Sequence, residues 1–240
     1  MNSSRLPGKP LADICGKPMI QHVWERAQEA EIPGDQTVIA ADDEAIIQAA
    51  ETFGALAVKT AESHESGTDR IAEVAALMGW APGEIVVNLQ GDEPLMPPAF
   101  VRMVGEALAQ NKDAALATAS CAITQIADVE NPNIVKVVSG VDGTALYFSR
   151  SPVPFARGGV DLKRFSYQRH VGLYAYRVKT LETLSKMPPN AIEQLECLEQ
   201  LRALAAGMKI HVSEVAEAPP HGVDTKADLI AVRKTLGGGL

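Results

Sequence analysis

The class of fold is indicated most clearly by Val86-Val87-Asn88-Leu89-Gln90-Gly91-Asp92-Glu93-Pro94. This stretch begins with apolar, β-branched residues, stops abruptly at Gln90 and ends at Pro94, which prevents a strand from continuing. In an α/β protein the pattern is typical of a buried parallel strand that ends where ligands bind. Gly91 allows the backbone to approach a ligand, and Asp92 offers a carboxylate that suits a hard cation such as Mg²⁺. An acidic turn after a core strand explains this motif by itself equally well.

The apolar pattern around this strand predicts an α/β fold. Before it, two strands alternate with amphipathic helices, as in doubly wound sheets, and Asp42 is the expected cap of one helix. After residue 113 the pattern changes to strands with little helix between them, which predicts an antiparallel extension or a small subdomain. The predicted strands are 37–41, 56–59, 114–123, 134–138, 145–148, 171–178 and 210–215, and the later predicted helices are 98–110, 192–206 and 225–236.

Composition narrows the class of protein. With 240 residues the chain is long enough to bury a sizeable core in one large or two small domains. Its net charge of −8 argues against broad binding to nucleic acid or anionic membranes. No apolar run reaches the length of a membrane span and no signal-peptide pattern is present, so we expect no membrane insertion and a cytoplasmic location. The three cysteines are widely spaced, which predicts neither a disulfide framework nor a metal knot.

Four loops carry groups that handle phosphate. The first holds Arg5 and Lys9 on a Pro-Gly turn, where the two cations could clamp a polyphosphate. The second is Ser66-Gly67-Thr68 at a helix start, where free N–H groups suit an anion or a base edge. The third contains Asp92, and the fourth contains Asp224 just before the last helix. Each has a plain alternative: a surface turn for the first loop, helix capping by Thr68 for the second and by Asp224 for the fourth.

Taken together and in order, the motifs are specific. From about residue 4 to residue 232 the chain closely resembles the 3-deoxy-manno-octulosonate cytidylyltransferases, also called CMP-Kdo synthetases. The motifs that carry the resemblance are Arg-Leu-Pro-Gly-Lys-Pro-Leu, Gly-Lys-Pro-Met-Ile, Ser-Gly-Thr-Asp-Arg, Asn-Leu-Gln-Gly-Asp-Glu-Pro, Ala-Leu-Tyr-Phe-Ser-Arg, His-Val-Gly-Leu-Tyr-Ala-Tyr-Arg, Leu-Glu-Gln-Leu-Arg and Gly-Val-Asp-Thr.

The resemblance implies a Rossmann-like nucleotide-diphospho-sugar transferase fold, with a mixed, mostly parallel sheet flanked by helices. The whole chain, 1–240, would be one cytidylyltransferase domain. Residues 1–113 and 180–240 would form the nucleotide-binding core, and residues 114–179 would serve sugar binding and dimerisation. The implied reaction is CTP + Kdo → CMP-Kdo + pyrophosphate, with Mg²⁺, for lipopolysaccharide synthesis. A homodimer is expected.

The resemblance also implies roles on the nucleotide side of the reaction. Lys9 would bind the triphosphate, and Arg5 would lie near the reacting groups. Asp92 and Asp224 would hold Mg²⁺ between nucleotide and Kdo, so that Arg5, Lys9 and the two aspartates form the catalytic set. Nucleotide binding would also involve Ser66, Gly67, Thr68 and Arg70, the first three of them beside the cytosine.

For the sugar acid, the resemblance implies an arginine for the carboxylate and amide, phenol and carboxylate groups for the hydroxyls. The implied residues are Gln90, Arg150, His170, Tyr174, Glu199 and Gln200. Taken alone, His170 is better explained by a structural role. Glu193, Glu196 and Glu199 are spaced as a solvated helix face would be, and we assign Glu199 to the sugar while leaving Glu193 and Glu196 open.

One departure from the family lies at the start of the chain. Family members begin with an apolar strand that ends Ile-Pro-Ala-Arg, and here Met1 stands where that strand has already passed. The first, central strand of the fold would thus be absent, together with a triphosphate-binding arginine, and we hypothesise that the natural polypeptide starts upstream.

Two other functions stay open at this point. A cytidylyltransferase for a related acidic sugar, 8-amino-Kdo or sialic acid, is the nearer alternative, although the Gln-Gly-Asp-Glu-Pro motif fits the Kdo enzymes better. A shortened, non-catalytic nucleotide-binding relative is the other. Retention of Lys9, Asp92, Arg150 and Asp224 argues against it, because a protein that only binds needs no metal pair.

Overall fold

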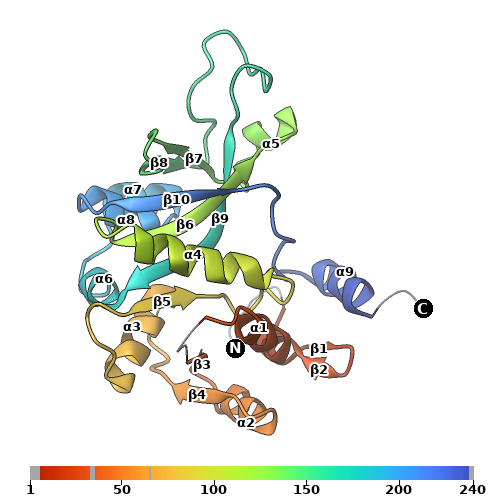
Figure 1. The fold of residues 1–240 in the computed structure, drawn as a ribbon. Helices are drawn as coiled ribbons and strands as arrows, with labels where there is room; N and C mark the ends of the chain where they lie inside the picture. The colour runs from red at the N-terminus through yellow and green to blue at the C-terminus, as the bar shows by residue number, and fades with distance from the viewer. Residues whose placement is uncertain (1–5, 33–35, 65, 238–240) are drawn as a thin grey trace. The chain divides into compact units, whose positions relative to one another are not determined.

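The chain divides into two units, and the computed structural model describes residues 6–32, 36–64 and 66–237 of it (Figure 1). Unit 1 consists of Met1–Trp80, Asn88–Met103 and Pro219–Leu240, and unit 2 consists of Ala81–Val87 and Val104–Ala218. Unit 1 is thus assembled from three separate stretches, so that residues far apart in the sequence come together in one body.

Unit 1 combines a small parallel sheet with helices. Its elements are η1 (Lys9–Leu11), β1 (Asp13–Ile14), β2 (Lys17–Pro18), α1 (Met19–Glu29), β3 (Val38–Ala41), α2 (Glu44–Thr52), β4 (Leu56–Lys59), α3 (Gly67–Met78) and α9 (Lys226–Leu236). Strands β3 and β4 pair in parallel, and α2, which connects them, packs against both. The alternating apolar residues of β3 bury Ile39 and Ala41 in one core cluster with Ile46 and Ala50 of α2.

The start of α2 corrects one expectation. Its cap is Asp43, whose carboxylate accepts a hydrogen bond from the N–H of Ala45 at 2.8 Å, so the prediction of Asp42 as the cap is wrong by one residue. Asp42 instead pairs with Arg70 of α3. Two adjacent aspartates at a strand end offer the same capping chemistry, and the sequence does not distinguish between them.

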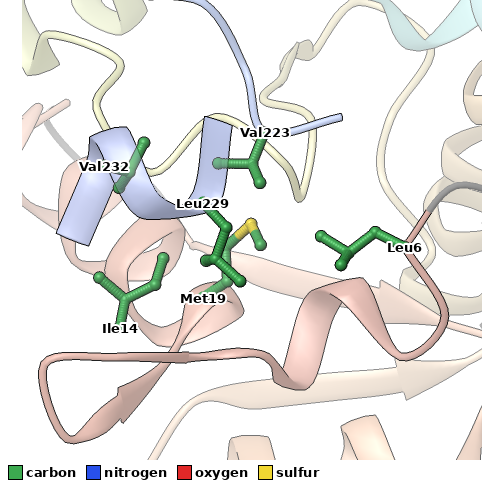
Figure 2. Close-up of a cluster of buried hydrophobic side chains, with 6 residues drawn as sticks. All are labelled: Leu6, Ile14, Met19, Val223, Leu229 and Val232. Carbon is green, nitrogen blue, oxygen red and sulfur yellow. The ribbon is translucent and has the colours of Figure 1, made fainter. Parts of the chain in front are cut away.

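A second core cluster of unit 1 joins the beginning and the end of the chain. It contains Leu6, Ile14, Met19, Val223, Leu229 and Val232, and Figure 2 shows these side chains gathered beside α9 and the β1–β2 hairpin. Burial of these side chains stabilises the fold roughly in proportion to the apolar area removed from water. It also fixes the main chain just before Lys9 and just before Asp224.

Unit 2 is built on a six-stranded sheet with the order β10-β6-β9-β7-β8, to which β5 adds by pairing with β9. The elements of this part are β5 (Ile85–Asn88), α4 (Pro98–Gln110), β6 (Leu116–Ala122), α5 (Ile126–Glu130), β7 (Lys136–Ser139), β8 (Ala145–Ser149), β9 (Gln168–Arg177), α6 (Val178–Leu184), α7 (Ala191–Glu196), α8 (Gln200–Ala205) and β10 (Ile210–Val215). The first residues of α4 and the last residue of β5 belong to unit 1. Helix α6 packs against β9, and α8 packs against β8.

The predicted α/β fold with a mixed sheet flanked by helices is confirmed. Along the order β10-β6-β9-β7-β8, the pair β10–β6 is parallel and the other pairs are antiparallel, so antiparallel pairing is more extensive than a mostly parallel sheet would have. None of the helices in the described ranges is long and apolar enough to cross a membrane.

The single helix predicted for 192–206 is wrong. Helix α7 ends at Glu196, Cys197 adopts the left-handed conformation with φ 51°, and α8 begins at Gln200. The apolar spacing continues across the break because both short helices bury one face, with Leu198 and Leu201 in the core. The apolar periodicity therefore indicates which residues are buried, but it does not show whether the helix is continuous.

Candidate functional site

Lys9 contacts two carboxylates that lie far apart in the sequence. Its Nζ atom lies 2.7 Å from Oδ2 of Asp92 and 3.3 Å from Oδ1 of Asp224. The lysine side chain is 14% exposed, whereas the side chain of Asp224 is 54% exposed, so the ammonium is enclosed and one carboxylate remains open to solvent. Two carboxylates that face one cation form a centre that can exchange the ammonium for another cation.

Three loops of unit 1 deliver these groups. Lys9 opens η1, directly after Gly8 in the left-handed conformation at φ 68°, a turn that glycine adopts without strain. Asp92 follows the end of β5 by four residues. Asp224 follows Val223, which is fully buried in the cluster of Figure 2.

The backbones of the two aspartate loops touch. The N–H of Val223 donates a hydrogen bond to the carbonyl of Asp92 at 2.7 Å. Gly222 makes this approach possible, since a Cβ atom there would lie 3.1 Å from the carbonyl oxygen of Asp92 and 3.4 Å from Cγ of Glu93. A residue with a side chain would push the loops apart, so Gly222 fixes the spacing of Asp92 and Asp224.

The N-terminus of α3 lies against the same segment. Ser66 caps the helix, and its hydroxyl oxygen accepts the N–H of Asp69, so the alternative of capping by Thr68 is wrong. A Cβ atom at Gly67 would lie 3.1 Å from Nε2 of Gln90, and the glycine therefore lets the Gln90 amide approach the helix start. Ser66, Gly67 and Gln90 form one polar edge of unit 1.

Arg70 ties α3 to the ends of both strands of the parallel sheet. Its guanidinium donates to the Asp42 carboxylate at 2.9 Å and to the Thr60 hydroxyl at 2.5 Å. Burial, the largest single effect, would raise the pKa of Asp42, but the opposing effects, led by the charge of Arg70, together lower that pKa below its usual value. Arg70 thus orients α3, and its predicted contact with a nucleotide stays a prediction.

Glu93 carries the most perturbed carboxyl group of unit 1. Burial, and after it the neighbouring charge of Asp92, raises the pKa of Glu93 to about 7. Its Oε2 atom is buried without a hydrogen-bond partner among the described residues. At neutral pH the Glu93 side chain therefore exists in both protonation states.

In unit 2, His170 is held as a neutral ring. The desolvation that accompanies burial, and secondarily the charge of Arg169, lowers the pKa of His170 to about 3. Its Nε2 lies 3.0 Å from the hydroxyl oxygen of Thr118, whose single proton has the carbonyls of Val171 and Leu173 as acceptors within reach, at 3.0 Å and 2.9 Å. A hydroxyl that donates its proton to one of these carbonyls can accept a proton from Nε2 of His170.

Two buried polar atoms of unit 2, one on β9 and one at the start of α8, lack partners among the described residues. The Tyr174 hydroxyl and Nε2 of Gln200 are both buried without a hydrogen-bond partner among the described residues. Burial, and after it the charge of the neighbouring Tyr176, raises the pKa of Tyr174 well above its usual value, and the negative charge of Glu199 adds a smaller effect. A buried, unsatisfied polar atom costs free energy, which a bound ligand with complementary groups can recover.

Arg150 is already engaged with backbone groups. Its Nε donates to the carbonyl of Glu196 at 2.6 Å, Nη1 to that of Pro132 at 3.0 Å and Nη2 to that of Cys197 at 3.4 Å. The predicted contact of this guanidinium with a sugar carboxylate would have to use its remaining N–H groups, and it stays a prediction.

The residues expected from the sequence therefore fall into two groups. In unit 1, the Nζ atom of Lys9 contacts both Asp92 and Asp224. The amide of Gln90 approaches Gly67, beside Ser66, at the start of α3. In unit 2 lie Arg150, His170, Tyr174, Glu199 and Gln200. Arg5 lies outside the described residues. The expected capping by Asp224 is wrong, since Thr225 caps α9 in a reciprocal arrangement with Asp228.

Sequence reasoning missed several groups. Glu93 stood in the quoted motif, but its burial leaves no mark on a sequence pattern. Thr118 lies inside an apolar strand, and Lys136 is a lysine at a strand start, a position that is normally solvated. Glu196 was left open, and its contacts come from residues more than 40 positions away.

The donor set at Lys9 fits a magnesium ion. Nowhere in the described part of the chain do three or more His, Cys, Asp and Glu residues gather into a group that could hold a metal. Mg²⁺ does not require one, because it is usually bound through one or two carboxylates and leaves its other positions to phosphates and water. Asp92 and Asp224 supply that number of carboxylates, on loops held together by the Val223–Asp92 hydrogen bond.

Known proteins match this chain over nearly its whole length. The model of the Cytidylyltransferase family matches residues 1–210. The 3-deoxy-manno-octulosonate cytidylyltransferase of Vibrio vulnificus (strain YJ016) is 52% identical to this chain over 239 residues. The protein of the same name from Pseudomonas syringae pv. syringae (strain B728a) is 48% identical over 242 residues. Each match covers 98% of this chain and 94% of the relative. A solved structure of CMP:2-keto-3-deoxy-manno-octonic acid synthetase complexed with CTP matches with a TM-score of 0.89 at 44% identity, covering 98% of this chain and 94% of that one.

Proposed function

Because this chain belongs to the cytidylyltransferase family, we propose that it transfers CMP from CTP to the anomeric hydroxyl of 3-deoxy-D-manno-octulosonate (Kdo). The products are CMP-Kdo, for lipopolysaccharide synthesis, and pyrophosphate. The observation that carries the proposal is the contact of Lys9 with both Asp92 and Asp224. A cation-binding pair of carboxylates beside an enclosed ammonium is what transfer from a nucleoside triphosphate requires.

The reaction is an in-line displacement at the α-phosphorus of CTP. The anomeric oxygen of Kdo forms a bond to this phosphorus, and the bond between the phosphorus and the bridging oxygen to the β-phosphate breaks. Pyrophosphate leaves with the electron pair, and the proton of the hydroxyl is released. No covalent bond to the protein forms, so the side chains act by positioning and by neutralising charge.

On the nucleotide side, we assign Lys9 to the triphosphate, where its ammonium exchanges carboxylate partners for phosphate oxygens. Ser66, Gly67 and Thr68 are assigned to the cytosine edge, and Arg70 completes the nucleotide-binding set. Support comes from the small residues Ser66 and Gly67 at the start of α3 and from the close approach of the Gln90 amide to Gly67. The assignment of Arg5 to the reacting groups rests on the family resemblance alone.

Asp92 and Asp224 would hold Mg²⁺, a proposal supported by the donor set described above. When bound, the ion neutralises phosphate charge and lowers the pKa of the attacking hydroxyl. The chain itself contributes the fixed spacing of the two loops, through Gly222 and the hydrogen bond from Val223 to Asp92.

On the sugar side, the assigned residues are Gln90, Arg150, His170, Tyr174, Glu199 and Gln200. The unsatisfied Tyr174 hydroxyl and Gln200 amide support this set, because a polyhydroxylated acid offers both donors and acceptors. His170 enters as a neutral hydrogen-bonding group, since the pKa of about 3 keeps it uncharged at the pH of the cell.

We further propose a homodimer in the cytoplasm, where CTP is found, without a nucleic-acid partner. Large apolar side chains on unit 2 support association: Leu146 on β8, Leu195 on α7 and Phe155 are 63%, 85% and 86% exposed. The net charge of −8 gives nucleic acid no attraction. Analytical ultracentrifugation tests the dimer, and a sedimentation coefficient of the monomer at micromolar protein concentration would contradict it.

The product identifies the reaction. With CTP, MgCl₂ and Kdo, ³¹P NMR should show the signal of a phosphodiester in CMP-Kdo rise with that of pyrophosphate. Parallel incubations with 8-amino-Kdo and sialic acid set the substrate preference, and we expect kcat/KM at least tenfold lower for each, since a site built for one set of hydroxyls leaves groups unpaired with another. A preference for either alternative sugar would overturn the assignment to Kdo.

A further inference from the structure

The main chain between α7 and α8 turns sharply at a residue that is not glycine. Cys197 has φ 51° and ψ 51°, a left-handed conformation that costs a residue with a side chain roughly 1 kcal/mol or more. Two and three residues after Cys197 come Glu199 and Gln200, the residues of this segment that we assign to the sugar acid. The conformation at Cys197 therefore decides where those two side chains point.

Glu196 and Arg150 hold the turn by a reciprocal set of hydrogen bonds. The carboxylate of Glu196 accepts the backbone N–H of Arg150 at 2.8 Å and the hydroxyl of Ser149 at 2.6 Å. In return, the guanidinium of Arg150 donates to the carbonyls of Glu196 at 2.6 Å and Cys197 at 3.4 Å. Both carbonyls at the strained turn are thus bound by one planar, charged group.

This set of bonds rests on a buried lysine. Lys136 is fully buried, and its ammonium donates to the carbonyls of Arg150 at 2.6 Å, Ile134 at 2.6 Å and Asn131 at 3.0 Å. Ser149, at 2% exposure, is also enclosed. The end of β8 therefore has no room to move, and it provides a fixed base for the turn.

Polar atoms near the turn could bind a ligand. The amide nitrogen of Gln200 is buried with no hydrogen-bond partner among the described residues, and the same holds for the hydroxyl of Tyr174. Leu198 and Leu201, on either side of this pair of polar residues, are buried in the core. A rotation at Cys197 would displace the Gln200 amide together with the residues around it, so the conformation of the turn sets the position of this amide.

We infer that Glu196 is a positioning residue for the sugar acid. Through Arg150 it holds the carbonyls of the Cys197 turn and so places Glu199 and Gln200. This inference rests on the proposed function, because it takes those two residues to contact Kdo. Glu196 itself does not contact the substrate in this account.

The chain offers a matched control on the same short helix. Glu193 also has a mostly buried carboxylate, but it pairs with Arg202 and forms a capping box with Asn190. Glu193 therefore stabilises the two helices without binding the turn through Arg150. Substituting Glu193 should lower thermal stability and leave the use of Kdo as it is.

The test compares Glu196→Gln with Glu193→Gln. We expect Glu196→Gln to raise the KM for Kdo about tenfold or more, because an amide cannot replace both charge-assisted bonds, while the KM for CTP changes less than about twofold. Glu193→Gln should change neither KM by more than about twofold. Adding Cys197→Gly to Glu196→Gln should recover most of the KM for Kdo, since glycine adopts the left-handed turn unaided, and adding Cys197→Ala should not.

Hydrogen–deuterium exchange of the segment 197–201, measured without substrate, tests whether Glu196 holds the turn independently of whether the protein uses Kdo. Faster exchange in Glu196→Gln than in Glu193→Gln, together with the KM effect, supports the inference. A rise in the KM for Kdo that merely follows the loss of thermal stability in both variants, or unchanged exchange, overturns it. If the wild-type protein shows no Kdo-dependent turnover while exchange responds as expected, the proposed function fails, and the turn is held by Glu196 for another purpose.

Discussion

Lys9 stands between two carboxylates at the position that a divalent cation would take. Its ammonium lies 2.7 Å and 3.3 Å from carboxylate oxygens of Asp92 and Asp224, and a metal ion at the same point would meet strong repulsion. Without a nucleotide, the ammonium therefore competes with the metal. In the proposed function, a bound triphosphate would offer the lysine other oxygens and release the carboxylates for the metal.

This competition predicts the behaviour of Lys9→Met. The variant should bind Mn²⁺ alone at least about tenfold more tightly than the wild type and bind CTP more weakly, because one positive charge is lost at contact distance. Electron paramagnetic resonance of free Mn²⁺ measures the first effect. Lys226→Met, which removes an exposed charge near Asp224, is the control, and an equal shift in both variants would show that only the overall charge matters.

The role of Asp92 predicts a separation of activity from stability. Its side chain is 30% exposed and contributes an ion pair rather than packing, so Asp92→Asn should lower the melting temperature by only a few degrees. Turnover should fall by about three orders of magnitude, since both the metal and the ammonium lose a charged partner. Melting followed by circular dichroism checks the variant, and early unfolding would make Asp92 a structural residue.

His170 predicts a pH dependence of stability. The folded-state pKa of His170 lies near 3, below its value of 6.5 in an unfolded chain, so the unfolded chain binds more protons between these values. The free energy of unfolding should therefore be complete above pH 6.5 and decline as the pH falls towards 3, by up to about 1 kcal/mol per pH unit from this group. Urea unfolding at several pH values should give a shallower decline for His170→Gln, and parallel curves would refute the assignment.

Among single residues, the sequence identified candidate site residues where a charged side chain lies close to a glycine or proline in a loop. Lys9 and Asp92 directly follow a glycine and Asp224 lies two residues after one, and all three could be chosen from the sequence, because loops at strand ends leave few other roles for a charged side chain. Glu196 and Lys136 could not be chosen. Their partners, backbone carbonyls and a serine hydroxyl, carry no residue-specific pattern.

At the level of elements, the backbone contact between the Gly222 loop and the segment after β5 sets the spacing of the two aspartates. We expect Gly222→Ala to lower kcat by roughly tenfold to a hundredfold, because its Cβ would force the carbonyl of Asp92 away and displace a carboxylate. Steady-state kinetics measures the effect. Gly83→Ala is the control, since a Cβ there would contact nothing, and it should retain full activity. Equal kinetics in both variants would mean that the loops tolerate separation.

The elements also show where periodicity stops being informative. Strands β4 and β10 and helix α4 have the bounds that their apolar patterns predicted. The helix predicted for 192–206 is broken at Cys197, because the hydrogen bonds from Arg150 stabilise a conformation that local preference disfavours. A tertiary contact with a residue 46 positions away thus outweighs a helical pattern.

For the molecule as a whole, the family resemblance predicted the α/β class and the reaction, and the order of the motifs carried that prediction. The directions of the strands in the larger sheet could not be predicted from the sequence, since an apolar run has the same pattern in either direction. The assembly of unit 1 from three stretches of chain brings Lys9, Asp92 and Asp224 together, and it follows from topology rather than from any local motif.

The central claim is that these two aspartates together bind the cation that serves CMP transfer to Kdo. Pyrophosphate release from CTP should be measured with and without Kdo, over a Mg²⁺ titration, for the wild type, Asp92→Asn and Asp224→Asn. The account predicts release that requires both Kdo and Mg²⁺ in the wild type, is abolished by EDTA and restored by added Mg²⁺, and is lost in both variants. Release that proceeds in EDTA, or that persists at the wild-type rate in either variant, would contradict it.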